Sequence, residues 1–472
     1  MGKTTRKASS SVVIGAIHNF SDKEVELFRE KLLSWYDLNK RKLPWRSIAA
    51  TEADVNKRAY AVWVSEIMLQ QTQVAVVLKY FEKWMSKWPT VWDLATTTLE
   101  EVNRVWAGLG YYSRARRLHE AAVKVVKEMD GNFPSSRDSL IKNIPGVGKY
   151  TGGAIASIAF GNAVGVVDGN VNRVLARIRV IGSDLSNLTT IDHMWKLADE
   201  LVDPNRPGDF NQAMMELGAT VCTPKSPSCA SCPVQDLCIA YRQEGNHKAS
   251  LIASNFFLKE SSESRKEKIV TDIECLPGCD LCLRKEDLDE RYGVHNYPSK
   301  KLKKEVKEQV LIIILLKQTD GQMLLLKRPK LGLLANLWEF PSISCEESNE
   351  ILTQHISEFF ALSKSVVNSR NFVGDATHVF SHIKQTYRIY KIDLKEDKQL
   401  VSWPSTYQSG KWMSKEEFLN SATSNAMKKV LKVVNTWEQK VKKSKRTCSD
   451  DHKDNKKQRT ISHFFKAATK ND

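Results

Sequence analysis

The feature that most constrains the fold is a glycine-containing turn between two short helical segments, within the stretch from Leu140 to Arg177. The turn is Ile-Pro-Gly-Val-Gly at 144–148, and small residues that favour a helix follow it from Lys149 to Phe160. Gly146 and Gly148 let the backbone approach a ligand closely, and the amides that begin the second helix suit a phosphate. We therefore predict a helical hairpin that binds a phosphate backbone, with a plain helical turn as the alternative.

A carboxylate follows this hairpin at a second junction between a loop and a helix. Asp168 lies twenty residues after Gly148 and directly precedes Gly169 and Asn170. It can face whatever the hairpin holds, or it can simply cap a helix in solvent. Together, the hairpin and the Asp loop resemble the helix-hairpin-helix base-excision DNA glycosylases.

Composition agrees with a nucleic-acid partner. The chain has 472 residues, a length typical of roughly two to four domains. Its net charge of +16 implies a polyanionic partner, either nucleic acid or a membrane surface. No apolar run reaches membrane-spanning length and 1–13 lacks a signal peptide, so we expect an intracellular protein without membrane contact. Most of the nine cysteines fall in two tight clusters, which indicates metal ligands before disulfides.

The N-terminal part is predicted to be a flexible tail over residues 1–24, followed by helices. Residues 21–24 read Ser-Asp-Lys-Glu, a capping box that begins a helix through Tyr36.

A further helix is predicted from about Tyr60 to Met85, and within it Glu66 is surrounded by apolar residues. Burial raises the pKa of a carboxyl group, and a protonated acid is what N7 of adenine needs. A solvated glutamate is the alternative, but the adjacent Gln-Gln-Thr-Gln run favours readers of base edges.

An aromatic pair flanked by glycine follows at Tyr111 and Tyr112. Arginines come directly after it, the first of them Arg114. This pattern suits a side chain wedged into the base stack beside phosphate contacts. A buried tyrosine with surface arginines is the alternative, but extruding a base requires something that holds the gap open.

The most specific motif is a set of cysteines with the spacing C-x6-C-x2-C-x5-C. Four thiolates this close can surround one metal centre, and zinc is chemically feasible. The spacing resembles the 4Fe-4S loop of the endonuclease III and MutY branch. The residues are Cys222, Cys229, Cys232 and Cys238.

From about residue 28 to residue 241, the chain resembles the MutY-type adenine DNA glycosylases in their eukaryotic form. The resemblance implies a catalytic acid at Glu66, a carboxylate at Asp168 that stabilises the sugar cation, and Asn170 as the residue holding these groups. Tyr150 takes the place where bifunctional relatives carry a Schiff-base lysine, which implies a monofunctional enzyme. Gln71 and Tyr111 match the intercalating residues.

The connector over residues 242–305 holds Cys275, Cys279 and Cys282. Three cysteines are one ligand short of a closed zinc site. In MutY homologues of the vertebrate type, a histidine ahead of the first catalytic helix completes such a site, and His18 matches it. Free surface thiols are the alternative. The resemblance also implies that mismatch-repair or checkpoint-clamp proteins bind this connector.

Residues 306–437 read as a strand-rich domain, with apolar strands predicted at 310–316 and 323–326 and an alternating one at 380–392. The segment 328–341 resembles the approach to a Nudix fold. The segment 345–363 lacks the glutamate array that a Nudix hydrolase needs, so we expect no nucleotide hydrolysis. The domain resembles the 8-oxoguanine-reading domain of MutY, whose Phe-Ser-His loop matches Phe380, Ser381 and His382.

The tail over residues 438–472 is predicted to be disordered. Its lysine and arginine clusters indicate nuclear import or DNA contact, and the basic N-terminal segment permits a mitochondrial share. A sliding-clamp binding box is predicted from an exposed pattern of anchors at Gln458, Ile461, Phe464 and Phe465.

We therefore expect a mainly α helix-hairpin-helix glycosylase domain over residues 25–241, with an iron–sulfur loop, and an α+β Nudix-like C-terminal domain. The expected reaction is excision of adenine paired with 8-oxoguanine or guanine in duplex DNA. The alternatives are an endonuclease III-like or thymine-mismatch glycosylase, and a non-catalytic scaffold that binds damaged DNA.

Overall fold

The structure is a computed structural model that describes residues 13–244, 275, 277–299, 306–344, 367–380, 383–396 and 406–443. The chain divides into two compact units. Unit 1 comprises residues 1–96 and 117–303, and unit 2 comprises residues 97–116 and 304–472. The segment 97–116, which the sequence places inside the glycosylase domain, thus groups with the C-terminal residues.

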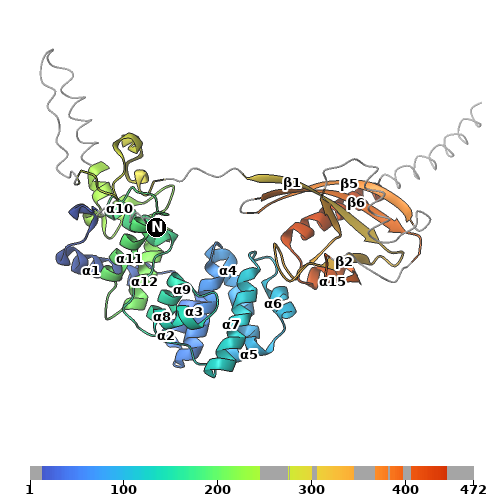
Figure 1. Cartoon of the computed structure of the whole chain (residues 1–472), viewed down its shortest axis with the longest axis horizontal. Coiled ribbons are helices and arrows are strands. Elements are labelled where there is room, and N and C mark those ends of the chain that lie inside the picture. Colours follow the sequence, from blue (N-terminus) through green and yellow to red (C-terminus); the bar gives the residue numbers. More distant parts are fainter. Residues whose placement is uncertain are drawn as a thin grey trace, which may run out of the picture. The chain divides into compact units, whose positions relative to one another are not determined.

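Unit 1 is helical (Figure 1). Its helices are α1 (Asp22–Asn39), α2 (Pro44–Thr51), α3 (Val55–Leu69), α4 (Val74–Lys87), α5 (Val91–Thr96), most of α7 (Ser113–Met129), α8 (Arg137–Asn143), α9 (Lys149–Ile158), α10 (Gly169–Ile178), α11 (Leu188–Leu201) and α12 (Pro207–Thr220). Short 3-10 turns are η1 (Ala16–His18), η2 (Cys229–Ser231), η3 (Gln235–Leu237), η4 (Lys285–Asp287) and η5 (Glu290–Asn296). Within the described ranges, no helix is both long and apolar enough to cross a bilayer.

Local sequence explains where the first helix begins and what it packs against. The predicted capping box is confirmed: the Ser21 hydroxyl accepts from the Glu24 amide, and the Glu24 carboxylate accepts from the Ser21 amide. Phe28, Leu32 and Tyr36 recur at intervals of four residues and are buried on one face of α1. That face packs into the core that α10, α11 and α12 share.

The single helix predicted from about Tyr60 to Met85 is wrong. The chain instead forms α3 and α4, with a turn at residues 70–73 between them. Gln71 adopts a left-handed backbone conformation there, with a φ of 55°. The apolar pattern continues through both helices, and neither Gly nor Pro marks the break, so periodicity alone could not show it.

Unit 2 is built on a seven-stranded sheet whose main order is β3-β2-β1-β6-β5, with β4 paired to β1 and β7 paired to β2. The strands are β1 (Lys307–Lys317), β2 (Met323–Lys327), β3 (Trp338–Glu339), β4 (Ser342–Ser344), β5 (Val367–Val379), β6 (Ile383–Leu394) and β7 (Ser409–Met413). Among the described residues of this unit, the helices are α6 (Leu99–Trp106), α15 (Lys415–Asn420) and one over residues 425–443.

The two longest strand pairings of the sheet differ in direction. β1 runs parallel to β6, from Lys307 beside Ile383 to Lys317 beside Asp393, while β5 and β6 form an antiparallel hairpin. The predicted runs 310–316 and 323–326 fall within β1 and β2. The predicted strand at 380–392 begins later, because Phe380 belongs to the turn that joins β5 to β6 and donates its amide to the Ile383 carbonyl.

Both faces of this sheet are buried, which explains the unbroken apolar run in β1. Ile313 and Leu315 face a core that the helix over residues 425–443 completes through Met427 and Val430. The intervening residues of β1 face a second core on the opposite side. The mixed helix-and-sheet fold class predicted from the sequence is confirmed.

Candidate active site and metal centres

The catalytic carboxyl group predicted at Glu66 is buried in the middle of unit 1. Glu66 lies on α3 and exposes only 5% of its surface. The phenol of Tyr150, on α9, donates to its Oε2 at 2.5 Å. Burial raises the pKa of Glu66 to about 7; the Tyr150 hydrogen bond opposes this shift, and the charge of Asp168 adds to it. Glu66 is therefore placed to hold a proton near neutral pH.

Asp168 occupies the N-cap of α10, as the loop-to-helix pattern predicts. Its Oδ1 accepts from the Val171 amide at 2.7 Å, and its Oδ2 accepts from the Asn170 side chain at 2.8 Å. Burial raises the pKa of Asp168, while these two donors stabilise its ionised form. The carboxylate thus has a fixed orientation and two donors that favour its negative charge.

Sequence reasoning missed Arg173, which holds Asn170 in place. Its guanidinium donates to Asn170 Oδ1 at 2.8 Å, to the Gly218 carbonyl at 2.6 Å and to the Cys222 carbonyl at 2.8 Å. The spacing of three residues from Asn170 to Arg173 on a helix is a signal that could have found the first contact. The two carbonyl contacts cross to the end of α12, and no local pattern shows them.

The glycine turn joins α8 to α9, and its geometry matches the predicted hairpin. Gly146 has a φ of 82°, and a Cβ atom there would lie 3.3 Å from the Cβ of Arg117. Gly148 is the N-cap of α9, without a side chain that would cap it, and a Cβ there would meet nothing within 4 Å. The first amides of α9 are therefore open to a ligand.

The two predicted intercalating residues share an unusual backbone. Gln71 and Tyr111 have φ values of 55° and 49°, a left-handed conformation that side chains rarely adopt. Both side chains are exposed, Tyr111 to 44%. Arg114, for which the sequence predicts a phosphate contact, is buried: its guanidinium lies over the rings of Trp106 and Tyr111, and burial lowers its pKa to about 10.

The cysteines of the predicted iron–sulfur loop surround one cavity beside α10 and α12. All four thiols line it: Cys222, Cys229, Cys232 and Cys238. Burial and the neighbouring thiols raise the pKa of Cys232 to about 12 and that of Cys238 to about 11. Four thiols that line one cavity are a donor set that fits a metal centre, which would stabilise their thiolate forms.

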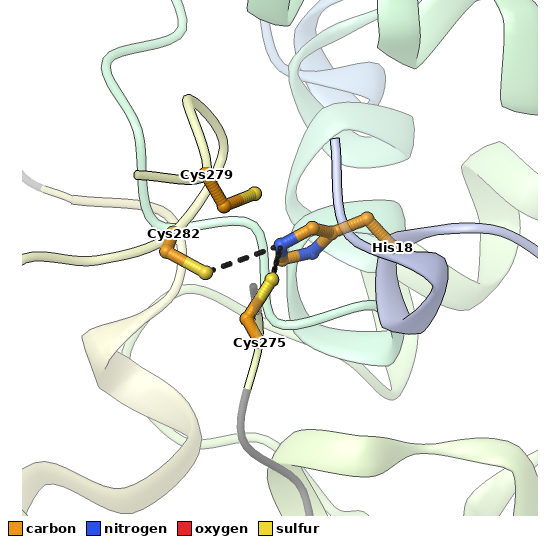
Figure 2. A group of neighbouring side chains, drawn as sticks. All are labelled: His18, Cys275, Cys279 and Cys282. Atoms are coloured by element: carbon orange, nitrogen blue, oxygen red, sulfur yellow. Dashed lines mark hydrogen bonds between the residues drawn. The ribbon is translucent and has the colours of Figure 1, made fainter. Parts of the chain in front are cut away.

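The predicted zinc ligands converge as well (Figure 2). The ligand atoms of His18, Cys275, Cys279 and Cys282 all lie within 4.8 Å of one another. Nε2 of His18 lies 3.3 Å from Cys282 Sγ and 3.5 Å from Cys275 Sγ. A nitrogen and a sulfur bound to one tetrahedral zinc ion lie roughly 3.6 Å apart, so these two distances fit a zinc site.

The histidine is held in the tautomer that a metal requires. Nδ1 of His18 donates to the Arg179 carbonyl at 2.8 Å, which leaves the lone pair on Nε2 facing the sulfurs. Burial lowers the pKa of His18 and so favours the neutral ring. Residues 13–18, assigned to the tail from the sequence, are thereby fixed to the connector, and Val13 also accepts from the Asp280 amide at 3.0 Å.

Unit 2 holds a separate cavity of about 330 Å³. Tyr111 and Arg116 line one side of it, and His378, Phe380 and Asn425 line other parts. Ser381 and His382, which complete the predicted Phe-Ser-His loop, lie outside the described residues, as does the predicted clamp box with Gln458, Ile461, Phe464 and Phe465.

The fold and this site define a class of protein: a helix-hairpin-helix base-excision glycosylase with an iron–sulfur loop. Residues 64–200 match the HhH-GPD superfamily base excision DNA repair proteins. Residues 222–238 match the iron–sulfur binding domain of endonuclease III, and residues 312–433 match the NUDIX domain.

Relatives narrow this class to one activity. The chain is 48% identical over 432 residues to an adenine DNA glycosylase of Homo sapiens, covering 89% of this chain and 76% of the relative. It is 44% identical to the adenine DNA glycosylase of Rattus norvegicus, over 98% of this chain and 90% of the relative. The chain therefore belongs to the adenine DNA glycosylase family, enzymes that hydrolyse the N-glycosidic bond of adenine in base excision repair.

Proposed function

We propose that the chain removes adenine paired with 8-oxoguanine, or with guanine, as a monofunctional glycosylase. The observation that carries this choice of mispair is the cavity in unit 2, which Tyr111 and Phe380 both line. Aromatic rings offer flat surfaces on which a base can stack, and the amide of Asn425 supplies polar contacts beside them. Such a pocket can bind the base opposite the target adenine.

Chemistry at the adenine would use the two carboxyl groups of unit 1 in different states. Glu66 donates its proton to N7 of adenine, so that the bond between N9 and C1′ breaks and its electron pair leaves with the neutral base. Asp168, ionised, faces the sugar cation and stabilises it. Water then adds to C1′ and releases a proton. Asn170 and Arg173 keep Asp168 oriented through this sequence.

DNA binding would use the open backbone and the exposed side chains described above. The amides beside Gly146 and Gly148 bind a phosphate, and Gln71 and Tyr111 enter the base stack. A flipped adenine then reaches Glu66. Tyr150 cannot form an imine, and this supports base release without strand cleavage by a lyase step.

The experiment that tests the substrate is single-turnover release of adenine from duplexes with adenine opposite 8-oxoguanine, guanine or thymine. We expect the fastest release opposite 8-oxoguanine and the slowest opposite thymine, and loss of all release in Glu66→Gln. Equal rates on the three duplexes would overturn the proposed mispair. Retained activity in Glu66→Gln would overturn the proposed acid.

Borohydride trapping separates the monofunctional reaction from a lyase. The wild type should give no strong covalent adduct with DNA, because an adduct requires an imine to the sugar. A strong adduct would instead support an endonuclease III-like mechanism. Binding to the 8-oxoguanine duplex without any base release would support the alternative of a non-catalytic scaffold that binds damaged DNA.

The two cysteine clusters would hold different metals. Cys222, Cys229, Cys232 and Cys238 would hold a 4Fe-4S cluster, which supplies four iron–thiolate bonds that close the loop after α12. His18, Cys275, Cys279 and Cys282 would hold Zn²⁺, which ties the segment before α1 to the connector. The convergence of the ligand atoms supports the second assignment.

Partners and location extend the proposal beyond DNA. A sliding clamp would bind the C-terminal box through Ile461, Phe464 and Phe465, and mismatch-repair or checkpoint-clamp proteins would bind the connector. The basic tail and the basic N-terminus support a nuclear location with a mitochondrial share. Loss of clamp binding in a Phe464→Ala/Phe465→Ala variant, with unchanged adenine release, tests the box.

A further inference from the structure

The turn that presents Tyr111, residues 107–112, is strained. Gly108 and Gly110 have φ values of 107° and 80°, and Tyr111 follows with 49°. The two glycines adopt such values freely, but a tyrosine does so only where its surroundings determine the conformation. The ring of Tyr111 is nevertheless 44% exposed, so other parts of the turn must be held in place.

The first set of contacts comes from the helices on either side of the turn. The Trp106 indole, at the end of α6, donates to the Gly110 carbonyl at 2.9 Å. The Arg114 guanidinium, in the first turn of α7, donates to the same carbonyl at 3.2 Å and lies over the Tyr111 ring. Both contacts fix the peptide group directly before Tyr111.

The second set of contacts comes from residues more than 300 positions away in the sequence. The Tyr112 hydroxyl accepts from the Gly108 amide at 3.1 Å and donates to the Thr423 carbonyl at 3.2 Å. The Asn425 side chain donates to the Gly108 carbonyl at 3.0 Å. Both polar backbone groups of Gly108 are therefore satisfied, one of them directly from the C-terminal part of unit 2 and the other through a hydroxyl that is fixed there.

Residues 422–425 are themselves attached to the sheet. The Trp338 amide, in β3, donates to the Ala422 carbonyl at 2.9 Å, and Thr423 is fully buried beside it. The same edge of the sheet also holds the start of α6, because Glu100 pairs with Lys327 at 3.0 Å and accepts from the Trp338 indole at 3.4 Å. The sheet thus contacts the segment 97–116 near its start, and the attached residues 422–425 contact it at the turn.

We infer that Tyr112 and Asn425 are positioning residues for Tyr111, and that the C-terminal sheet, through residues 422–425, determines how that side chain is presented to DNA. This inference rests on the proposed role of Tyr111 in the base stack. It also gives the Nudix-like fold a second role, because Asn425, which lines the cavity together with Phe380, is also the residue that binds the turn. Opening of the base pair and contact with the opposite base would then depend on one rigid unit.

The test is a double-mutant cycle between Asn425→Ala and Tyr111→Ala, two residues that no direct hydrogen bond joins. The readouts are the single-turnover rate of adenine release and the fluorescence of 2-aminopurine beside the target adenine, which rises when the bases unstack. We expect Asn425→Ala to slow release about 5- to 20-fold and to reduce the fluorescence rise, as expected for the loss of a hydrogen bond at a strained turn. In the Tyr111→Ala background, Asn425→Ala should change nothing further.

Matched variants keep the result interpretable. Asn435→Ala makes the same change on the same helix, away from the turn, and should behave as wild type. Tyr112→Phe removes only the hydroxyl and should reproduce the Asn425→Ala defect, with a melting temperature near that of the wild type. These variants show whether a defect comes from the turn and not from unfolding of the sheet.

Three results would overturn the inference. Asn425→Ala and Tyr112→Phe could both release adenine at the wild-type rate while Tyr111→Ala is slow. The role of Tyr111 would then stand, but Asn425 and Tyr112 would not position it. The losses of rate in Asn425→Ala and Tyr111→Ala could instead add in full in the double variant. Asn425 would then act independently of Tyr111. If Tyr111→Ala alone has no effect on rate or fluorescence, the proposed role of Tyr111 fails, and nothing is left to position.

Discussion

At the residue scale, the proposed chemistry depends on Glu66 keeping a proton that an ordinary glutamate has lost at neutral pH. Burial on α3 raises its pKa to about 7, whereas Asp168 keeps two donors that favour its ionised form. In the proposed reaction, these two carboxyl groups take different roles because their surroundings differ. Sequence analysis predicted the raised pKa from the apolar neighbours of Glu66, but it could not predict the Tyr150 hydrogen bond, which joins residues 84 positions apart.

The first prediction concerns the pH dependence of base release. Because only the protonated Glu66 can donate to N7, the single-turnover rate should fall as pH rises through about 7, approaching tenfold per pH unit above it. Rates on the duplex with 8-oxoguanine, measured from about pH 5 to about pH 9, test this. A rate that rises through neutral pH would exclude Glu66 as the acid.

The second prediction concerns Tyr150→Phe. The phenol donates to Glu66 at 2.5 Å and thereby favours the ionised carboxylate, so its loss should raise the pKa of Glu66 further. The fall in rate should then occur at higher pH than in the wild type, with activity retained below pH 7. The comparison is the midpoint of the two pH profiles; a midpoint moved to lower pH would contradict the stated role of the phenol.

At the element scale, the local signals in the sequence were sufficient for helix ends and turns. The capping box at Ser21, the glycine turn before α9 and the Asp168 cap all depend on residues within a few positions of one another. The break between α3 and α4 carried no such signal, because a left-handed Gln71 depends on the surrounding fold. Contacts between side chains and carbonyl groups far away in the sequence, such as those of Arg173, could not be predicted from local signals either.

The third prediction concerns α12 and the loop before α2. Glu216 is fully buried on α12, where Arg41 donates to it at 2.6 and 2.8 Å and Arg46 at 2.9 Å. Glu216→Gln leaves both guanidinium groups without a charged partner and should lower the free energy of unfolding by about 3 kcal/mol. Urea unfolding monitored by tryptophan fluorescence measures the change.

A control and a pH test accompany this variant. Glu200→Gln breaks an exposed pair with Lys196 and should cost at most about 0.5 kcal/mol. The arginines lower the pKa of Glu216, so its contribution is present above the ordinary value of 4.5 and is lost as pH falls through the lowered one. Equal losses of unfolding free energy in the two variants would show that the buried ion pairs of Glu216 stabilise the protein no more than an exposed pair does.

At the scale of the whole molecule, the sequence predicted the order of the parts but not how the chain distributes itself between the two units. Segment 97–116 reads as part of the helical region, and its own residues favour a helix and a glycine turn. What joins it to the rest of unit 2 includes hydrogen bonds between residues far apart in the sequence: Lys327 donates to Glu100, and Asn425 donates to the Gly108 carbonyl. Periodicity and composition do not carry that information.

Helix α10 connects the proposed chemistry of unit 1 to both cysteine clusters. It begins at the Asp168 cap, and the carbonyls at its C-terminal end accept from each cluster: Arg177 from the Cys238 thiol at 3.6 Å, and Arg179 from His18 at 2.8 Å. The two sets of ligands share no residue. The two proposed metals should therefore bind independently, and we expect both to stabilise the same helix.

The fourth prediction follows from that separation. Wild-type protein should contain about four iron atoms for each zinc. Cys282→Ser should lose zinc and keep the visible absorbance of the iron–sulfur cluster, whereas Cys238→Ser should lose the cluster and keep zinc. Each variant should melt at a lower temperature than the wild type, because one of the two ligand sets that contact the end of α10 loses its metal. Elemental analysis of purified protein measures both metals, and loss of both from either variant would show that they form a single cooperative centre.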